Sequence, residues 1–81
     1  MRLQKKATML ILVGELERRG HSVKADGYWL EINEGHHSQY AAIVQVDKLL
    51  DLNGTPDLFE IGYHCREIEQ QLEENDSYEY H

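Results

Sequence analysis

Cysteine, proline, tryptophan and phenylalanine each occur only once among the 81 residues. Because Cys65 is the only cysteine, no internal disulfide exists, and nothing in the sequence indicates an oxidising compartment. The longest strongly apolar run, Met9 to Val13, is far too short to cross a bilayer. Gly14-Glu15 follows that run where a secretory signal would have a small-residue cleavage site. We therefore expect a soluble, cytoplasmic protein.

Basic residues are few, with eight Lys or Arg against fifteen Asp or Glu and a net charge of −7. The imbalance is uneven: residues 1–24 hold six basic and two acidic residues, whereas residues 25–81 hold two and thirteen. Such an acidic body argues against direct nucleic-acid binding, because phosphate contacts need a positive patch. It permits a basic protein partner, or occupation of a groove built for nucleic acid. A solvated surface that keeps the protein soluble explains the same charge without any partner.

The length suits one domain, residues 1–81, with 76–81 as a frayed tail. Its clearest periodic signal is a long helix after residue 55, where apolar residues recur at steps of three and four. Thr55 is placed as the N-cap, Pro56 suits the first helical position, and Asp57 favours the positive end of the helix dipole. The apolar stripe consists of Leu58, Ile61, Cys65, Ile68 and Leu72.

A first helix is predicted from Leu3 to Arg19, with Gly20 as its C-terminal stop. Its apolar residues surround most of the helix, which is typical of a helix with protein on two sides. One side carries Leu3, Ala7, Leu10, Ile11 and Gly14, and the other carries Met9, Leu12 and Leu16. Either the sheet and the last helix cover both sides, or the chain self-associates as a homodimer. We assign self-association to Met9, Leu12 and Leu16.

Asp26-Gly27 is a preferred two-residue turn and predicts a β-hairpin over residues 21–32. Pairing outward from it sets Ala25 opposite Tyr28, Val23 opposite Leu30 and His21 opposite Ile32 on one face. Lys24 with Trp29 and Ser22 with Glu31 fall on the other face. Trp29 therefore points away from the core, where it is either covered by a neighbouring segment or is a contact residue.

Residues 39–46 alternate and predict a third strand with Tyr40, Ala42, Val44 and Val46 on one face. A short helical turn over Lys48–Leu52 follows, and a helix through Tyr40–Leu52 is the competing interpretation. Together these segments predict a small α+β domain of order α-β-β-β-α. Its antiparallel sheet is expected to be packed by helices on one face.

The sequence gives little support for a metal site or a catalytic site. His64 and Cys65 are adjacent, so on a helix their side chains point about 100° apart and form neither a metal pair nor a nucleophile–base pair. No phosphate loop, nucleophile elbow or zinc motif occurs. We expect no metal, no cofactor and no catalysis. The alternative is a metal-dependent or catalytic homodimer that uses His36, His37, His64 and Glu67.

Aromatic residues indicate protein recognition. Phe59 and Tyr63 lie one turn apart, opposite the apolar stripe, unless they pack beneath residues 48–54 or belong to a strand. Aromatic rings in acidic surroundings suit a protein interface, in which rings anchor and charges steer. Two further tyrosines, Tyr78 and Tyr80, lie in the acidic tail.

We expect a small, acidic, non-enzymatic protein-binding module that inhibits or regulates a partner by occupying its surface. A nucleic-acid-handling complex is one candidate partner. Small acidic inhibitors from phages and mobile elements, anti-CRISPR proteins among them, share this size and charge but no motif. A self-assembling structural subunit is another alternative. The predicted contact residues are Trp29, Phe59 and Tyr63 as anchors, surrounded by Glu60, Glu67, Glu73 and Glu74.

Overall fold

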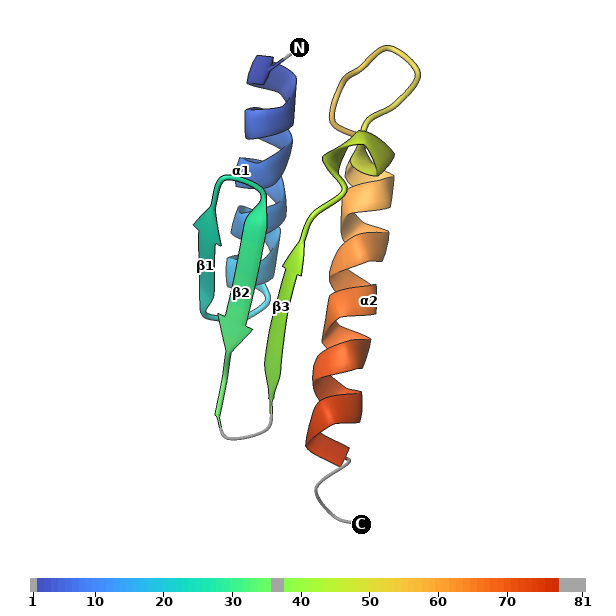
Figure 1. Cartoon of the computed structure of the whole chain (residues 1–81). Coiled ribbons are helices and arrows are strands. Elements are labelled where there is room, and N and C mark those ends of the chain that lie inside the picture. Colours follow the sequence, from blue (N-terminus) through green and yellow to red (C-terminus); the bar gives the residue numbers. More distant parts are fainter. Residues whose placement is uncertain (1, 36–37, 78–81) are drawn as a thin grey trace.

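Two helices and a three-stranded antiparallel sheet form the structure, a computed structural model that describes residues 2–35 and 38–77. The sheet order is β1-β2-β3, with α1 behind β1 and β2 and with α2 running beside β3 (Figure 1). The predicted α+β class and the order α-β-β-β-α are confirmed. The elements are α1 (Arg2–Arg18), β1 (Val23–Asp26), β2 (Trp29–Asn33), β3 (Gln39–Ile43), the 3-10 helix η1 (Val46–Leu49) and α2 (Leu58–Ser77).

The core lies between one face of the sheet and the two helices. In β2, Leu30 and Ile32 are buried, whereas Trp29, Glu31 and Asn33 are exposed on the opposite face. This alternation shows that the helices cover one face and leave the other open. The buried cluster comprises Met9, Leu12, Leu16, Leu30, Ile32, Val44, Val46, Leu49, Ile61, Cys65, Ile68 and Leu72.

Gly20 ends α1 as predicted. Its φ of 97° lies in the left-handed region, which only glycine adopts without strain. The N–H of Gly20 donates to the carbonyl of Glu17 at 3.0 Å, and the N–H of His21 donates to that of Leu16 at 3.1 Å. These two bonds form a Schellman motif, which satisfies the last carbonyls of the helix and turns the chain toward the sheet.

The start of α2 differs from the prediction. Oδ1 of Asp57 accepts hydrogen bonds from the N–H groups of Phe59 at 3.0 Å and Glu60 at 3.3 Å, so Asp57 rather than Thr55 is the N-cap. Pro56 precedes the helix and pairs with Leu50 in an isolated bridge. Leu58 is therefore the first helical residue and extends past the core with 70% of its surface exposed. Its place in the buried stripe was wrong, whereas Ile61, Cys65, Ile68 and Leu72 are confirmed.

The hairpin register is also corrected. Ala25 pairs with Leu30, and Gly27 and Tyr28 form the two-residue turn. Gly27, with φ 62°, occupies the first central position, where a type II′ turn requires glycine. Each residue of β1 therefore pairs with a β2 residue that lies two positions later in the sequence than predicted. A shift of two keeps every side chain on its face, so Leu30 and Ile32 are buried as predicted, whereas Ala25 and Tyr28, near the tip of the hairpin, are exposed.

The third strand ends at Ile43, three residues before the prediction, and the helical turn begins earlier, at Val46. Val44 and Val46 still face the core. The competing helix through residues 40–52 is wrong, because residues 39–43 pair with β2.

At the C-terminal end of the described chain, α2 continues through Ser77, so the tail predicted from Asp76 begins too early. Tyr78 and Tyr80 lie outside the described residues.

Candidate functional site

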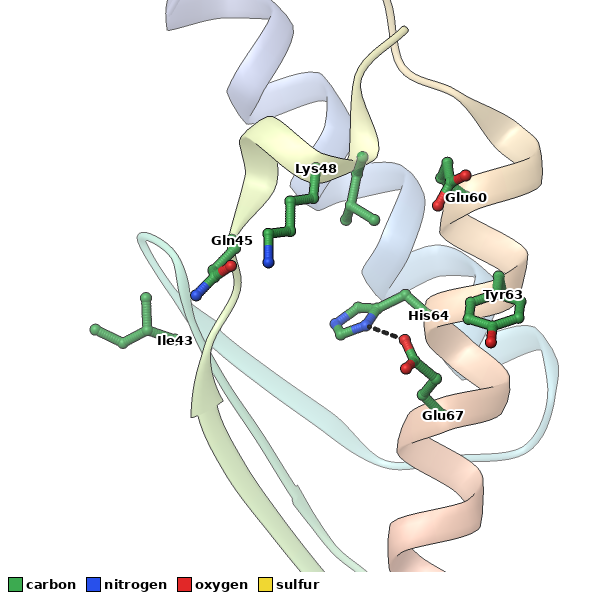
Figure 2. A pocket seen from close by; sticks show the side chains of 8 residues that line it. Ile43, Gln45, Lys48, Glu60, Tyr63, His64 and Glu67 are labelled. Atoms are coloured by element: carbon green, nitrogen blue, oxygen red, sulfur yellow. Dashed lines mark hydrogen bonds and ion pairs between the residues drawn. The ribbon is translucent and has the colours of Figure 1, made fainter.

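A cavity of about 320 Å³ lies between α2 and the segment that joins β3 to η1 (Figure 2). The ring of His64 reaches from α2 toward Gln45 and Lys48 on the facing segment (Figure 2). Carboxylates of Glu60 and Glu67 flank it on the helix. The site is therefore polar on both sides, with two acids against one ammonium group. Its lining residues are Ile43, Gln45, Lys48, Leu49, Glu60, Tyr63, His64 and Glu67.

His64 is held from one side only. Its Nδ1 lies 3.5 Å from Oε1 of Glu67, which is at the limit of a hydrogen bond. Its Nε2 is buried and has no hydrogen-bond partner among the residues that the structure describes. A buried polar atom without a partner costs on the order of 1–3 kcal/mol.

Of the four residues of the metal or catalytic alternative, the cavity brings together His64 and Glu67. Within residues 2–35 and 38–77, no group of three His, Cys, Asp or Glu side chains is placed to hold a metal ion. His36 and His37, which the metal alternative requires, lie outside the described residues. Cys65 is buried in the core, and this burial raises its pKa to about 11. A protonated, enclosed thiol is a packing residue and not a nucleophile.

Phe59 and Tyr63 point into solvent, with 89% and 60% of their surface exposed. They belong to α2, so the alternative that this stretch is a strand is wrong. Tyr63 also lines the cavity, beside Glu60 and Glu67. Helix periodicity thus placed one predicted anchor and two predicted acids at one site. Glu73 and Glu74 are exposed further along the same helix.

Trp29 lies on the open face of the sheet, with 39% of its surface exposed. Its indole Nε1 donates to Oε1 of Glu31 at 2.8 Å. Across the sheet it pairs with Ile43, which is 68% exposed and also lines the cavity. Ile43 therefore connects the tryptophan to the rim of the cavity. The sequence signal for Ile43 was the alternation of β3, which turns every second residue away from the core.

The self-association residues proposed from the sequence are corrected. Met9, Leu12 and Leu16 are buried in the core of the chain itself, against the sheet and α2. They are the inner side of α1 and offer no surface to a second copy. Among the residues of α1 whose burial the structure describes, the large exposed apolar side chains are Leu10 and Ile11, which lie on the opposite side.

A second polar cluster joins the end of α1 to α2. The two ring nitrogens of His21 lie 2.9 Å from Oε2 of Glu34 and 2.8 Å from Oε2 of Glu69. Arg19 donates from Nη1 to the other oxygen of Glu69 at 2.7 Å. Burial alone would lower the pKa of His21, but its hydrogen bonds to Glu69 and Glu34 outweigh burial and raise it. Both nitrogens of His21 have partners, so this cluster acts as a clamp between elements.

No known protein family, curated protein or solved structure matches this chain. In the part of the chain that the structure describes, neither helix has the length and apolar character needed to span a membrane.

Proposed function

We propose that this protein is a non-enzymatic, acidic protein-binding module that regulates or inhibits a partner by covering its surface. The exposed side of α2 and the adjoining cavity form the contact. The observation that carries the proposal is the pair Phe59 and Tyr63, which are exposed by 89% and 60% one turn apart on an acidic helix. Large rings supply most of the free energy at protein interfaces, and neighbouring charges steer the encounter.

The cavity beside Tyr63 adds specificity to this contact. A polar side chain of the partner that entered it would lie beside the ring of His64, whose Nδ1 faces Glu67 at 3.5 Å. The carboxylates of Glu60 and Glu67 at the same site favour a partner group that carries positive charge. We therefore infer that a Lys or Arg side chain, or the edge of a basic surface, lies against this region.

The partner is a protein with a basic binding surface, and its encounter with α2 takes place in the cytoplasm. Nucleic-acid-handling proteins have such surfaces, because they must contact phosphates. If the partner is one of them, the acidic helix occupies the position of the nucleic acid. Competition with DNA or RNA separates this case from a contact elsewhere on the partner.

The test is affinity capture from source-cell lysate with three forms of the chain. They are the wild type, a Phe59→Ala/Tyr63→Ala variant and a Leu52→Ala control. Leu52 is fully exposed in the loop before α2 and does not line the cavity, so its truncation removes exposed apolar area without changing the two rings or the cavity. Circular dichroism must show that all three forms are folded.

We expect one discrete partner to be retained by the wild type and by Leu52→Ala and to be lost from the double variant. Raising the salt concentration tenfold should weaken the complex, because the steering charges are exposed. Equal retention by the double variant would show that the two rings are not anchors. A complex insensitive to both salt and His64→Ala would remove the cavity and its acids from the contact.

A further inference from the structure

The outer side of α1 is apolar although the chain leaves it uncovered. Leu10 is 74% exposed and Ile11 is 37% exposed, while the inner residues Leu12 and Leu16 are fully buried. A helix with apolar residues most of the way round normally has protein on two sides. The sheet and α2 cover the inner side and border the two flanks of α1, beside Leu10 and beside Ile11, but the side between these flanks still lacks a partner.

Gly14 lies at the centre of that outer side. A Cβ atom at this position would meet nothing within 4 Å, so no close contact inside the chain requires glycine. Glycine in the middle of a helix is destabilising relative to alanine. Gly14 also lines an open groove of about 360 Å³ between α1 and α2, together with Ile11 and Leu58. A missing side chain beside exposed apolar residues permits a second helix to approach closely.

Charged residues on α1 indicate that the approaching helix is α1 of a second copy of the chain. Lys6 and Glu17 are both exposed and lie eleven residues apart, close to three helical turns, so they share one flank of α1. Neither makes an ion pair with any residue that the structure describes. In an antiparallel pair of identical helices related by a two-fold axis near residue 12, Lys6 of each copy meets Glu17 of the other.

The apolar residues have the same symmetry. Leu10 and Gly14 are placed evenly about residue 12, so the same axis sets each Leu10 against the Gly14 of the other copy. A two-fold interface requires one surface to be complementary to itself in this way. The charged pair and the pair formed by Leu10 and Gly14 have midpoints within about half a residue of each other, so one two-fold axis accommodates both.

We propose that this protein forms an antiparallel homodimer through the outer side of α1. Leu10 packs over Gly14 of the second copy, Ile11 meets its own equivalent near the axis, and two pairs of Lys6 with Glu17 flank the contact. Phe59 and Tyr63 belong to α2 and do not line the groove that holds Ile11 and Gly14, so this contact leaves them exposed. The dimer therefore presents two copies of the surface proposed above for a partner. An interface made chiefly by one helix pair is small, so the association is weak and depends on concentration.

Sedimentation equilibrium of the full chain at micromolar to millimolar concentrations tests this proposal. We expect the wild type to approach the mass of two chains at the high end. Leu10→Glu should weaken the dimer at least tenfold, because it places a charge at the centre of the contact. Gly14→Leu should do the same by filling the space that the second helix needs, while circular dichroism remains helical. Leu52→Glu is the matched control and should leave the dimer unchanged.

Charge exchange tests the antiparallel register. Lys6→Glu alone and Glu17→Lys alone should each weaken the dimer by about three- to tenfold, since each removes two pairs and adds repulsion. Combining the two changes should restore the wild-type constant to within about threefold. A chain that stays monomeric at millimolar concentration would overturn the dimer. A dimer indifferent to Leu10→Glu and Gly14→Leu, or one that the double exchange does not rescue, would overturn this interface.

Discussion

Nε2 of His21 lies 2.8 Å from Oε2 of Glu69, although 48 residues of chain separate them. The Schellman turn at Gly20 carries His21 off the end of α1, and helix periodicity places Glu69 on the flank of α2 that faces α1. Since Nδ1 of the same ring faces Glu34, the histidine joins α1, the end of β2 and α2. The clamp is strongest when the ring is protonated and both carboxylates are ionised.

The first prediction is that this clamp makes stability depend on pH. The pKa of His21 is raised above its ordinary 6.5, so its stabilisation is complete below pH 6.5 and is lost as the pH rises through the raised value. The hydrogen bond from His21 lowers the pKa of Glu69 below its ordinary 4.5, so that contribution is present above 4.5 and is lost as the pH falls through the lowered value. Urea unfolding measured as a function of pH should therefore show the highest free energy of unfolding between pH 4.5 and pH 6.5.

His21→Gln is the matched variant for that experiment. It should be less stable than the wild type near pH 6 and should show a smaller loss of stability on going to about pH 8.5. Identical pH profiles for the two proteins would show that His21 is neutral in the fold and that the clamp does not depend on its charge.

A second prediction compares one substitution at two sites of the same helix. Leu12→Ala should lower the free energy of unfolding by about 2–5 kcal/mol, because Leu12 is fully buried. Leu10→Ala should change it by less than about 0.5 kcal/mol at concentrations where the chain is monomeric, because Leu10 is exposed. Denaturant unfolding of both variants measures this difference. Similar losses at the two sites would mean that α1 is rotated relative to the described packing.

The third prediction concerns the start of α2. Asp57→Ala should cost about 1 kcal/mol, because the carboxylate of Asp57 accepts hydrogen bonds from two backbone N–H groups in the first turn. Thr55→Ala should cost less than about 0.5 kcal/mol, because Thr55 lies outside the helix. Asp57→Asn is the conservative control and should retain most of the stability. The reverse ranking of Asp57 and Thr55 would restore Thr55 as the cap.

The fourth prediction concerns Cys65. Its pKa of about 11 leaves only about one thiol in a thousand ionised at pH 8, and the side chain is buried. Its reaction with a chromogenic disulfide reagent should therefore be at least about a hundredfold slower in the folded protein than in the same chain in urea. Adding Leu12→Ala should speed the reaction by raising the unfolded fraction. A fast reaction in the folded protein would show that Cys65 is accessible.

Several features of this chain follow from local physics and were predictable from the sequence. Helix periodicity in residues 61–72 requires one buried stripe, and Gly20 can end α1 because it alone adopts a positive φ without strain. Alternation in β2 and β3 assigns inward and outward faces, and these faces are the same in registers that differ by two residues. The same periodicity placed Phe59 and Tyr63 on the outside of α2, beside Glu60 and Glu67. Local patterns therefore determined the fold class and half of the candidate site.

Other features were decided only by the tertiary structure. Lys48 and Ile43 reach the cavity because the segment after β3 lies against α2, a contact that no local pattern specifies. Local turn preferences allow the hairpin turn at Asp26-Gly27 or at Gly27-Tyr28, and both registers keep the same faces. The second register is the one observed, in a sheet where β2 also pairs with β3. Both sides of α1 are apolar, so periodicity cannot choose between them. Tertiary packing decides which side of α1 faces the core. Met9, Leu12 and Leu16 pack in the core with the sheet and α2, and this leaves Leu10 and Ile11 exposed to solvent.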